Sequence, residues 1–304
     1  MTDRAQRPRV VVEPGTGRPV LMAPERQQRP MHTGSRKVSA RCPFCAGHEA
    51  DTPVERDAVR DADGAWLARA FENKYPATRH HEVVAEGGAH HEHPCDLDRA
   101  AWRAALELWQ RRVRRMELDD GLAHAFLFKN VGARAGASIA HNHSQVIGLE
   151  QLPPRLQLEL EQQRAAGRCH VCTVAARAAT DDREVWAGDG FVAFAPDPPK
   201  LPFETWLAPR SCAHDFFEAD LDALAAAMQA WFRGLDRALD RPACNLWLHR
   251  VGAGQLAAGE RFHWHFELQP RTGQLAGLEL GGDMYINSVP PQLTAQRMRD
   301  PAAG

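Results

Sequence analysis

The chain has 304 residues, of which 44% are hydrophobic and 25% are charged, and its formal net charge is −2. This length is enough to bury a full core, and the near-neutral charge gives no electrostatic reason to expect binding to nucleic acid or to a membrane surface. No apolar run approaches the roughly 18 residues of a membrane span and no signal peptide is recognisable, so we expect a cytoplasmic protein.

The N-terminal part combines a predicted hairpin with a cysteine turn. Residues 9–30 contain two short apolar runs around a Pro-Gly-Thr-Gly turn, which predicts two strands. Cys42-Pro-Phe-Cys45 is the first of two Cys-x-x-Cys pairs, and the following Gly47 suits the tight turn of a zinc knuckle. Seven cysteines in a chain without a secretion signal favour thiolate metal ligands over disulfides.

Two strands and a long amphipathic helix are predicted next. One strand runs from Trp66 to Phe71, and a second one follows from His81 to Ala85. A helix is predicted from Asp96 to about Glu117, because its apolar residues recur at three- and four-residue steps. The arginines of this helix lie on its other face, which is typical of a solvated surface.

The stretch from Ala140 to Ile147 carries most of the chemistry that the sequence suggests. As a β-strand it points His141, His143 and Gln145 to one face. The preceding loop, residues 130–138, is rich in small residues and can bring backbone amides close to an anion. Imidazoles beside such a loop indicate phosphoryl chemistry.

The second half of the chain repeats the order, spacing and residue types of the first. The repeated residues are Cys42/Cys45 and Cys169/Cys172, Asp63-Gly64 and Asp189-Gly190, Ala89-His90 and Ala213-His214, Asp96-Leu97-Asp98 and Asp220-Leu221-Asp222, Val131-Gly132-Ala133 and Val251-Gly252-Ala253, and His141/His143 and His263/His265. A second amphipathic helix follows the second Asp-Leu-Asp. The chain is therefore predicted to be an internal duplication of a strand-rich unit with one long helix.

The duplication selects two sets of metal ligands. Each half offers two cysteines and two histidines, a closed tetrahedral set that favours structural zinc. The predicted ligands are Cys42, Cys45, His90 and His141 in the first half, and Cys169, Cys172, His214 and His263 in the second. His91 and His93 are alternatives to His90, which only the register of the Asp-Leu-Asp triplets favours. We therefore expect two zinc ions per chain.

With His141 assigned to metal, His143 remains for chemistry. Neutral imidazole is a good nucleophile towards phosphorus near pH 7, and attack on an α-phosphate gives a covalent nucleotidyl-histidine. Gln145 is placed to donate an amide hydrogen to a phosphate oxygen, as are Ser138 and the loop amides. The second half has Glu267 at the position of Gln145, and a carboxylate repels phosphate. We therefore expect one catalytic centre.

The sequence resembles galactose-1-phosphate uridylyltransferase and its relatives in the histidine-triad superfamily, over about residues 9–292. The resemblance lies in residues 24–30, the Cys42/Cys45 turn, Phe71-Glu-Asn73, residues 130–145, His263-Trp-His265, residues 275–279 and residues 284–287. It implies a ping-pong nucleotidyl transfer through His143, with Arg26, Arg29, Asn73 and Asn130 near the substrate. It also implies a homodimer in which the N-terminal arginines reach the partner's site.

Two positions depart from the usual family pattern. Asn142 stands where the family usually has proline, and Ser144 stands where the uridylyltransferases usually have glycine. A serine before the glutamine is more similar to the adenylyl-transferring phosphorylases of the superfamily. The nucleobase and the sugar therefore stay open.

Together these features predict an α+β fold with an antiparallel sheet and one long helix per half. The expected units are a histidine-triad-like half at residues 1–150, a connector at 151–168, a second half at 169–290 and a tail at 291–304. The leading hypothesis is transfer of a nucleoside monophosphate, UMP first, between a nucleotide-sugar and a hexose 1-phosphate, as in galactose metabolism. The alternatives are an adenylyl-transferring phosphorylase acting on ADP-glucose or dinucleoside polyphosphates, and a zinc-stabilised nucleotide-binding protein without catalysis.

Overall fold

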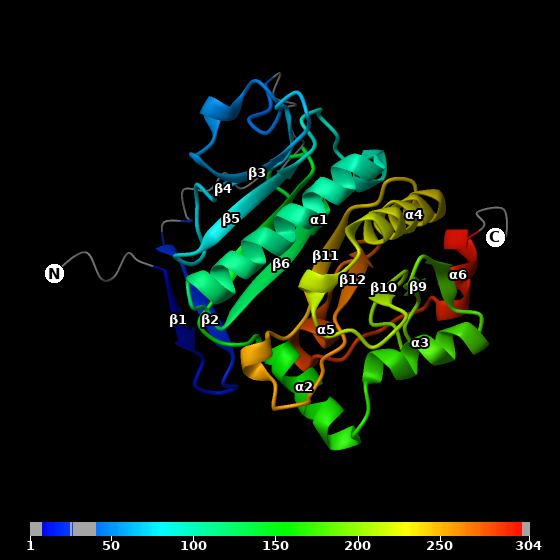
Figure 1. The fold of residues 1–304 in the computed structure, drawn as a ribbon. Coiled ribbons are helices and arrows are strands. Elements are labelled where there is room, and N and C mark those ends of the chain that lie inside the picture. The colour runs from blue at the N-terminus through cyan, green and yellow to red at the C-terminus, as the bar shows by residue number, and fades with distance from the viewer. Residues whose placement is uncertain (1–7, 25, 27–40, 300–304) are drawn as a thin grey trace.

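An antiparallel sheet of ten strands is the framework of the protein in the computed structural model, which describes residues 8–24, 26 and 41–299 (Figure 1). The strands follow one another in the order β3-β4-β5-β7-β6-β11-β12-β10-β9-β8. Their bounds are β3 Glu55–Arg60, β4 Trp66–Glu72, β5 His81–Glu86, β6 His124–Val131, β7 His143–Leu149, β8 Glu184–Gly188, β9 Phe191–Phe194, β10 Thr205–Pro209, β11 Cys244–His249 and β12 His265–Pro270.

The two halves of the sheet have matching strand orders on either side of the β6–β11 pair. The first half runs β3-β4-β5-β7-β6 from the edge inwards, and the second runs β8-β9-β10-β12-β11. A duplicated unit would produce this arrangement. Mixed helices and an antiparallel sheet confirm the predicted α+β class.

Two long helices, α1 (Arg99–Arg114) and α4 (Leu221–Leu239), lie side by side against one face of the sheet (Figure 1). Each begins at an aspartate whose carboxylate accepts backbone N–H groups of the first turn, Asp98 in α1 and Asp220 in α4. The buried indole of Trp102 stacks on Phe232 with ring centroids 5.3 Å apart, which joins the two helices in one apolar core.

The remaining helices are α2 Pro154–Ala166, α3 His170–Thr180, α5 Gly277–Gly282 and α6 Pro291–Arg299. The predicted connector thus contains a complete helix. The part of the predicted tail that the structure describes forms α6, which places Ala295 and Met298 in the core beside α4. None of the helices among the described residues is both long and apolar enough to cross a membrane.

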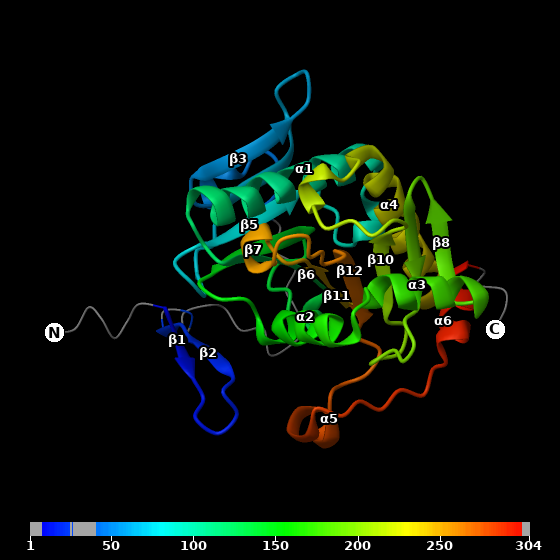
Figure 2. The same ribbon diagram turned by 60° about the horizontal axis from the view of Figure 1, so that its bottom comes forward.

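The predicted N-terminal hairpin is present as β1 (Arg9–Val12) paired with β2 (Pro19–Met22), and it stands apart from the large sheet (Figure 2). Its apolar side chains are unusually accessible. Val10, Val11, Val12, Val20, Leu21 and Met22 are each 40–55% exposed.

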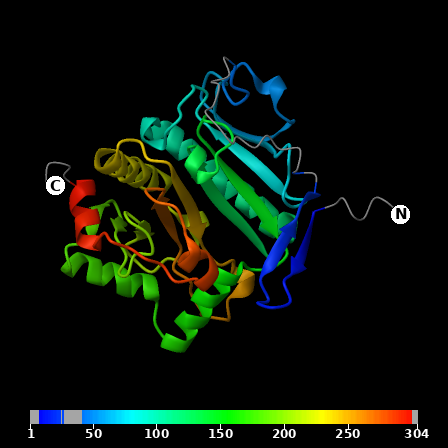
Figure 3. The same cartoon turned by 180° about the vertical axis from the view of Figure 1, so that it is seen from behind.

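The central strand begins later than the sequence predicts, because β7 starts at His143 and His141 lies in the bend before it. Alternation then places Ser144 under α1, where its hydroxyl accepts a hydrogen bond of 2.6 Å from the Trp109 indole. His143 and Gln145 alternate with Ser144 and so point to the opposite face, where they line a cavity. Figure 3 shows the molecule from behind, the side away from α1 and α4. The candidate site therefore lies on the face that α1 and α4 leave open.

Candidate functional site

The first predicted metal site is assembled as expected. The thiols of Cys42 and Cys45 and ring nitrogens of His90 and His141 all lie within 4.8 Å of one another. The His141 Nδ1 atom is 3.8 Å from the Cys42 sulfur and 3.6 Å from the Cys45 sulfur. Zinc bonds of about 2.3 Å to sulfur and about 2.0 Å to nitrogen in a tetrahedron place these atoms roughly 3.6 Å apart, so the donors fit zinc.

The His141 ring is oriented by the backbone. Its Nε2–H donates to the carbonyl of Gly87 at 2.8 Å, which leaves the Nδ1 lone pair facing the two thiols. Such a carbonyl acceptor behind a metal ligand fixes the ring tautomer. Of the alternatives to His90, His93 contacts Cys95 and Pro242 instead, and His91 does not join the cluster among the described residues.

The second predicted metal site is also assembled, but with one different ligand. Cys169, Cys172 and His263 come together with Cys212 and not with His214. The His263 Nδ1 atom lies 3.7 Å from the Cys169 sulfur and 3.3 Å from the Cys172 sulfur. The Nε2–H of the same ring donates to the backbone carbonyl of Pro209. His214 is exposed on the loop after β10. The prediction of His214 is therefore wrong.

The error arises from the register of the Asp-Leu-Asp triplets. The residue that caps α1 is Asp98, the last of its triplet, whereas the residue that caps α4 is Asp220, the first of its triplet. Aligning the two caps instead places Cys212 opposite His90, each eight residues before its cap. A cysteine in place of a histidine keeps the set suitable for zinc.

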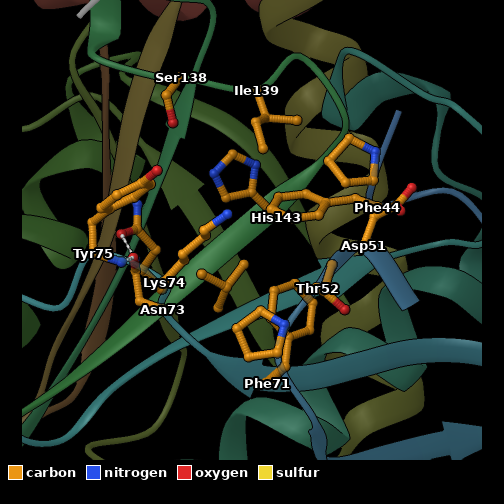
Figure 4. Close-up of a pocket in the computed structure, with 14 residues that line it drawn as sticks. Phe44, Asp51, Thr52, Phe71, Asn73, Lys74, Tyr75, Ser138, Ile139 and His143 are labelled. Atoms are coloured by element: carbon orange, nitrogen blue, oxygen red, sulfur yellow. Dashed lines mark hydrogen bonds between the residues drawn. The ribbon is translucent and has the colours of Figure 1, made fainter. Parts of the chain in front are cut away.

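A cavity of about 330 Å³ lies on the open face of the first half (Figure 4). It brings together four of the predicted site residues, His143, Gln145, Ser138 and Asn73. Apolar and polar groups line the rest of its wall. These residues are Pro43, Phe44, Asp51, Thr52, Pro53, Phe71, Lys74, Tyr75, Val83 and Ile139.

A hydrogen bond to the backbone fixes which nitrogen of the His143 ring carries the proton. Its Nδ1 atom is 2.8 Å from the backbone carbonyl of His141, and a carbonyl can only accept, so Nδ1 carries the proton. The Nε2 atom of the neutral ring then carries the lone pair. The Phe44 ring packs edge-on against the imidazole with centroids 5.3 Å apart, which ties the cysteine turn to the candidate nucleophile.

The other predicted substrate-binding residues are placed less directly. Arg26 donates a hydrogen bond to the carbonyl of Tyr75, a residue that lines the cavity. Asn130 lies on β6, where its side-chain Oδ1 accepts a hydrogen bond of 2.7 Å from the side-chain NH2 group of Asn245, and it does not line the described cavity. Arg29 lies outside the described residues.

The corresponding position in the second half is filled by protein. The His265 ring is fully buried under Trp206, with centroids 4.7 Å apart. Both carboxylate oxygens of Glu267 lie 2.7 Å from Arg155. Burial raises the pKa of Glu267, but His249, the His265 hydrogen bond, Lys200 and Arg155 outweigh it and hold the pKa well below its usual range. This arrangement supports the expectation of one catalytic centre.

Sequence reasoning missed several residues of the site. Phe44 sits inside the first Cys-x-x-Cys pair and was not expected to form the cavity wall. His81 starts β5, and its side chain contacts Gln145 at 2.9 Å. Its place follows from the β5–β7 register, which puts odd-numbered residues of both strands on one face and which the sequence alone does not supply.

Comparisons with known proteins find relatives over nearly the whole chain. The profile of a family described as the N-terminal domain of DUF4931, a domain of unknown function, matches residues 26–152. The ADP-glucose phosphorylase of Arabidopsis thaliana is 28% identical over 97% of this chain and 93% of its own length. The galactose-1-phosphate uridylyltransferase of Thermotoga maritima is 22% identical over 92% of this chain and 94% of its own.

Solved structures lead to the same group. A crystal structure of an Arabidopsis thaliana ADP-glucose phosphorylase with bound ADP-glucose has a TM-score of 0.76 and 28% identity, over 96% of this chain and 99% of that chain. A uridylyltransferase structure, 22% identical with a TM-score of 0.76, shares the fold over 95% of this chain and 97% of that chain. Over nearly its whole length the chain is therefore similar to galactose-1-phosphate uridylyltransferase-like proteins, a group that includes nucleotidyltransferases and phosphorylases.

Proposed function

We propose that this protein transfers a nucleoside monophosphate from a nucleotide-sugar to a phosphate-bearing acceptor through a covalent nucleotidyl-His143. One observation carries the proposal: the His143 Nδ1–H is committed to the His141 carbonyl at 2.8 Å, in a cavity that Gln145 and Ser138 also line. A neutral imidazole with its lone pair on Nε2 is the form that attacks phosphorus.

In the first step, Nε2 of His143 bonds to the α-phosphorus while the bond to the leaving sugar phosphate breaks. The leaving phosphate takes the electron pair and needs no proton. The positive charge that forms on the ring is stabilised by the His141 carbonyl, which already accepts the Nδ1–H. Gln145 and Ser138 donate to the phosphate oxygens as their charge grows.

In the second step, a phosphate oxygen of the acceptor attacks the same phosphorus and the phosphorus–nitrogen bond breaks, which restores neutral His143. A hexose 1-phosphate accepts the group in a uridylyltransferase, and inorganic phosphate accepts it in a phosphorylase. The two zinc sets are proposed to be structural, because each offers four protein ligands and leaves no position for substrate.

Two nucleotides are candidates for the transferred group. Uridylyl transfer is the first hypothesis from the sequence. Adenylyl transfer is favoured by the similarity to ADP-glucose phosphorylase, which at 28% identity exceeds the 22% shared with the Thermotoga maritima uridylyltransferase. The Ser144 hydroxyl faces Trp109 beneath the strand, so this residue is not expected to contact the base directly.

Intact-protein mass spectrometry distinguishes these possibilities. Incubation with UDP-glucose alone is expected to add a uridylyl mass if the first hypothesis holds, and ADP-glucose an adenylyl mass if the second does. His143→Gly is expected to abolish the adduct and keep the zinc content. Binding of both nucleotide-sugars without any adduct would favour a non-catalytic binding protein, and loss of zinc in the variant would exchange the roles of His141 and His143.

The accessible hairpin supports the proposal of a homodimer. A lone two-stranded hairpin with exposed valines on both strands is marginally stable in water and favours a partner. Val11→Lys together with Leu21→Lys is therefore expected to give a monomer in light-scattering measurements. Leu158→Lys, at a leucine on α2 that is 55% exposed, serves as the control and is expected to keep the dimer.

A further inference from the structure

The loop between β4 and β5 presents two backbone donors to side chains at the cavity. The N–H of Tyr75 donates to the side-chain oxygen of Asn73 at 2.9 Å, and the N–H of Ala77 donates to Nδ1 of His81 at 2.9 Å. A backbone N–H can only donate. Nδ1 of His81 is therefore unprotonated, and the amide of Asn73 directs its NH2 group away from the loop.

These two assignments determine the next one. A neutral His81 with a bare Nδ1 carries its proton on Nε2, which lies 2.9 Å from Oε1 of Gln145. The NH2 group of Asn73 lies 3.3 Å from the same oxygen. The 3.2 Å approach between Asn73 Nδ2 and His81 Nε2 is then a contact between two donors and not a hydrogen bond. Only a carbonyl oxygen can face both donors.

The positions of these residues follow from strand register. The β5–β7 pairing places Val83 opposite Gln145 and His81 opposite Ile147, so His81 and Gln145 are diagonal neighbours on one face. His81 is 3% exposed and Gln145 is 8% exposed, so water competes little for their hydrogen bonds. Arg26 also holds this loop, through its hydrogen bond to the carbonyl of Tyr75.

We propose that His81 is a positioning residue that, together with Asn73, locks the side-chain amide of Gln145 with its oxygen turned inward and its NH2 group turned towards the phosphate that His143 attacks. The backbone of the β4–β5 loop sets this orientation through Tyr75 and Ala77. This inference rests on the proposed function, because it concerns the same phosphate and the same nucleophile.

The test is a double-mutant cycle on adduct formation from whichever nucleotide-sugar labels the wild-type protein. His81→Leu removes the donor and frees the amide to turn, so the rate constant of nucleotidylation is expected to fall about tenfold to a hundredfold with a smaller change in KM. In a Gln145→Ala background the same substitution is expected to cost less than about twofold, because His81 acts through Gln145.

Two further variants separate positioning from folding. His81→Gln supplies an amide NH2 in place of the imidazole N–H and is expected to recover most of the rate. His80→Leu, at the neighbouring histidine that faces Asp120 at 3.6 Å, is the matched control and is expected to keep the wild-type rate. Zinc content and melting temperature are measured for each variant, and His81→Phe, which also lacks the donor, replaces His81→Leu if the latter does not fold.

The outcomes distinguish the two proposals. The positioning role would be overturned if His81→Leu lowered the rate constant equally in the wild-type and Gln145→Ala backgrounds, or if it changed only KM. Either result would leave the role of His143 as nucleophile in place. A wild-type protein that forms no adduct with UDP-glucose or ADP-glucose would instead overturn the proposed function, and the inference with it.

Discussion

At the scale of single residues, backbone carbonyls decide which ring nitrogen each key histidine presents. Gly87 accepts the Nε2–H of His141, and Pro209 accepts the Nε2–H of His263, so both rings turn Nδ1 towards their thiols. The carbonyl of His141 instead accepts the Nδ1–H of His143. Histidines with similar sequence surroundings therefore present opposite nitrogens to their ligands.

The second metal set leads to a prediction that separates two nearby residues. Cys212→Ala is expected to remove one of two zinc ions per chain, because Cys212 lies with Cys169, Cys172 and His263 within 4.8 Å. His214→Ala, on the same loop, is expected to keep both ions. Elemental analysis of the purified proteins measures this directly. Loss of zinc from the His214 variant with retention in the Cys212 variant would contradict the ligand set.

A buried histidine far from both metal sets predicts the acid sensitivity of the fold. Burial lowers the pKa of His124 to about 3, with the charges of Arg250 and His249 acting in the same direction. Between about pH 6.5 and pH 3 the unfolded chain binds a proton that the folded chain does not, so stability falls as pH falls. The slope contributed by one such group approaches about 1.4 kcal/mol per pH unit.

His124→Leu removes this contribution. The variant is expected to lose less stability than the wild-type protein between pH 7 and pH 5, measured by urea unfolding at each pH. Parallel pH profiles for the two proteins would show that His124 is not the group that titrates.

At the scale of elements, the spacing of apolar residues in the sequence was enough to predict the long helices and several strands. The regular spacing of Trp102, Leu106 and Trp109 identified α1, and all three side chains are buried against the sheet. The strands β4 and β5 were recognised from their composition and from the turns that separate them. Four of the predicted cavity residues meet, because His143 and Gln145 share one face of β7 and because Asn73 directly follows β4, which is separated from β7 only by β5.

The errors arose where no local pattern carries the information. Which aspartate caps a helix depends on where the chain enters it, so repeated Asp-Leu-Asp triplets gave a register two residues off and selected His214. The helix α6 is short and polar, and only tertiary contact with α4 explains why Met298 is buried. The hydrogen bond from His81 to Gln145 requires the β5–β7 register, which a single sequence does not contain.

The approach of α6 to α4 explains a glycine inside a long helix and gives a prediction. A Cβ at Gly234 would lie 3.1 Å from the backbone oxygen of Met298. Glycine normally weakens a helix, but here it permits the close approach. Gly234→Leu is therefore expected to lower the free energy of unfolding by roughly 1–3 kcal/mol through overpacking. Arg233→Ala, at the exposed neighbouring position, is the control and is expected to change the free energy of unfolding by less than about 0.5 kcal/mol. Equal losses of stability in the two variants would show that Gly234 does not pack closely against Met298.

At the scale of the whole molecule, one continuous sheet carries two similar metal sets with unequal relations to the site. In the first ligand set, Pro43 and Phe44 lie between Cys42 and Cys45 in the sequence and form part of the cavity wall. The same set includes His141, whose backbone carbonyl orients the His143 ring. The second set fixes the start of α3 to the other half of the sheet, where Glu267 is neutralised by Arg155. We therefore expect the first ligand set to support the proposed activity and the second to support the fold alone.

This asymmetry predicts different consequences for two equivalent substitutions. Cys45→Ala and Cys172→Ala are each expected to remove one zinc ion and lower the melting temperature, because each set cross-links segments distant in the chain. Cys45→Ala is also expected to slow nucleotidylation of His143 by about tenfold or more, since a small displacement of a reacting group is costly. Cys172→Ala is expected to keep the rate per folded molecule within about twofold.

Single-turnover adduct formation at a temperature where both variants remain folded measures the difference. His48→Ala, at a half-buried position near the same turn, is not a suitable control because the His48 ring contacts the Cys42 carbonyl at 2.7 Å. Leu158→Ala on α2 serves instead and is expected to leave zinc content, melting temperature and rate unchanged. Equal slowing by the two cysteine variants would mean that the sheet transmits the loss of either metal set to His143.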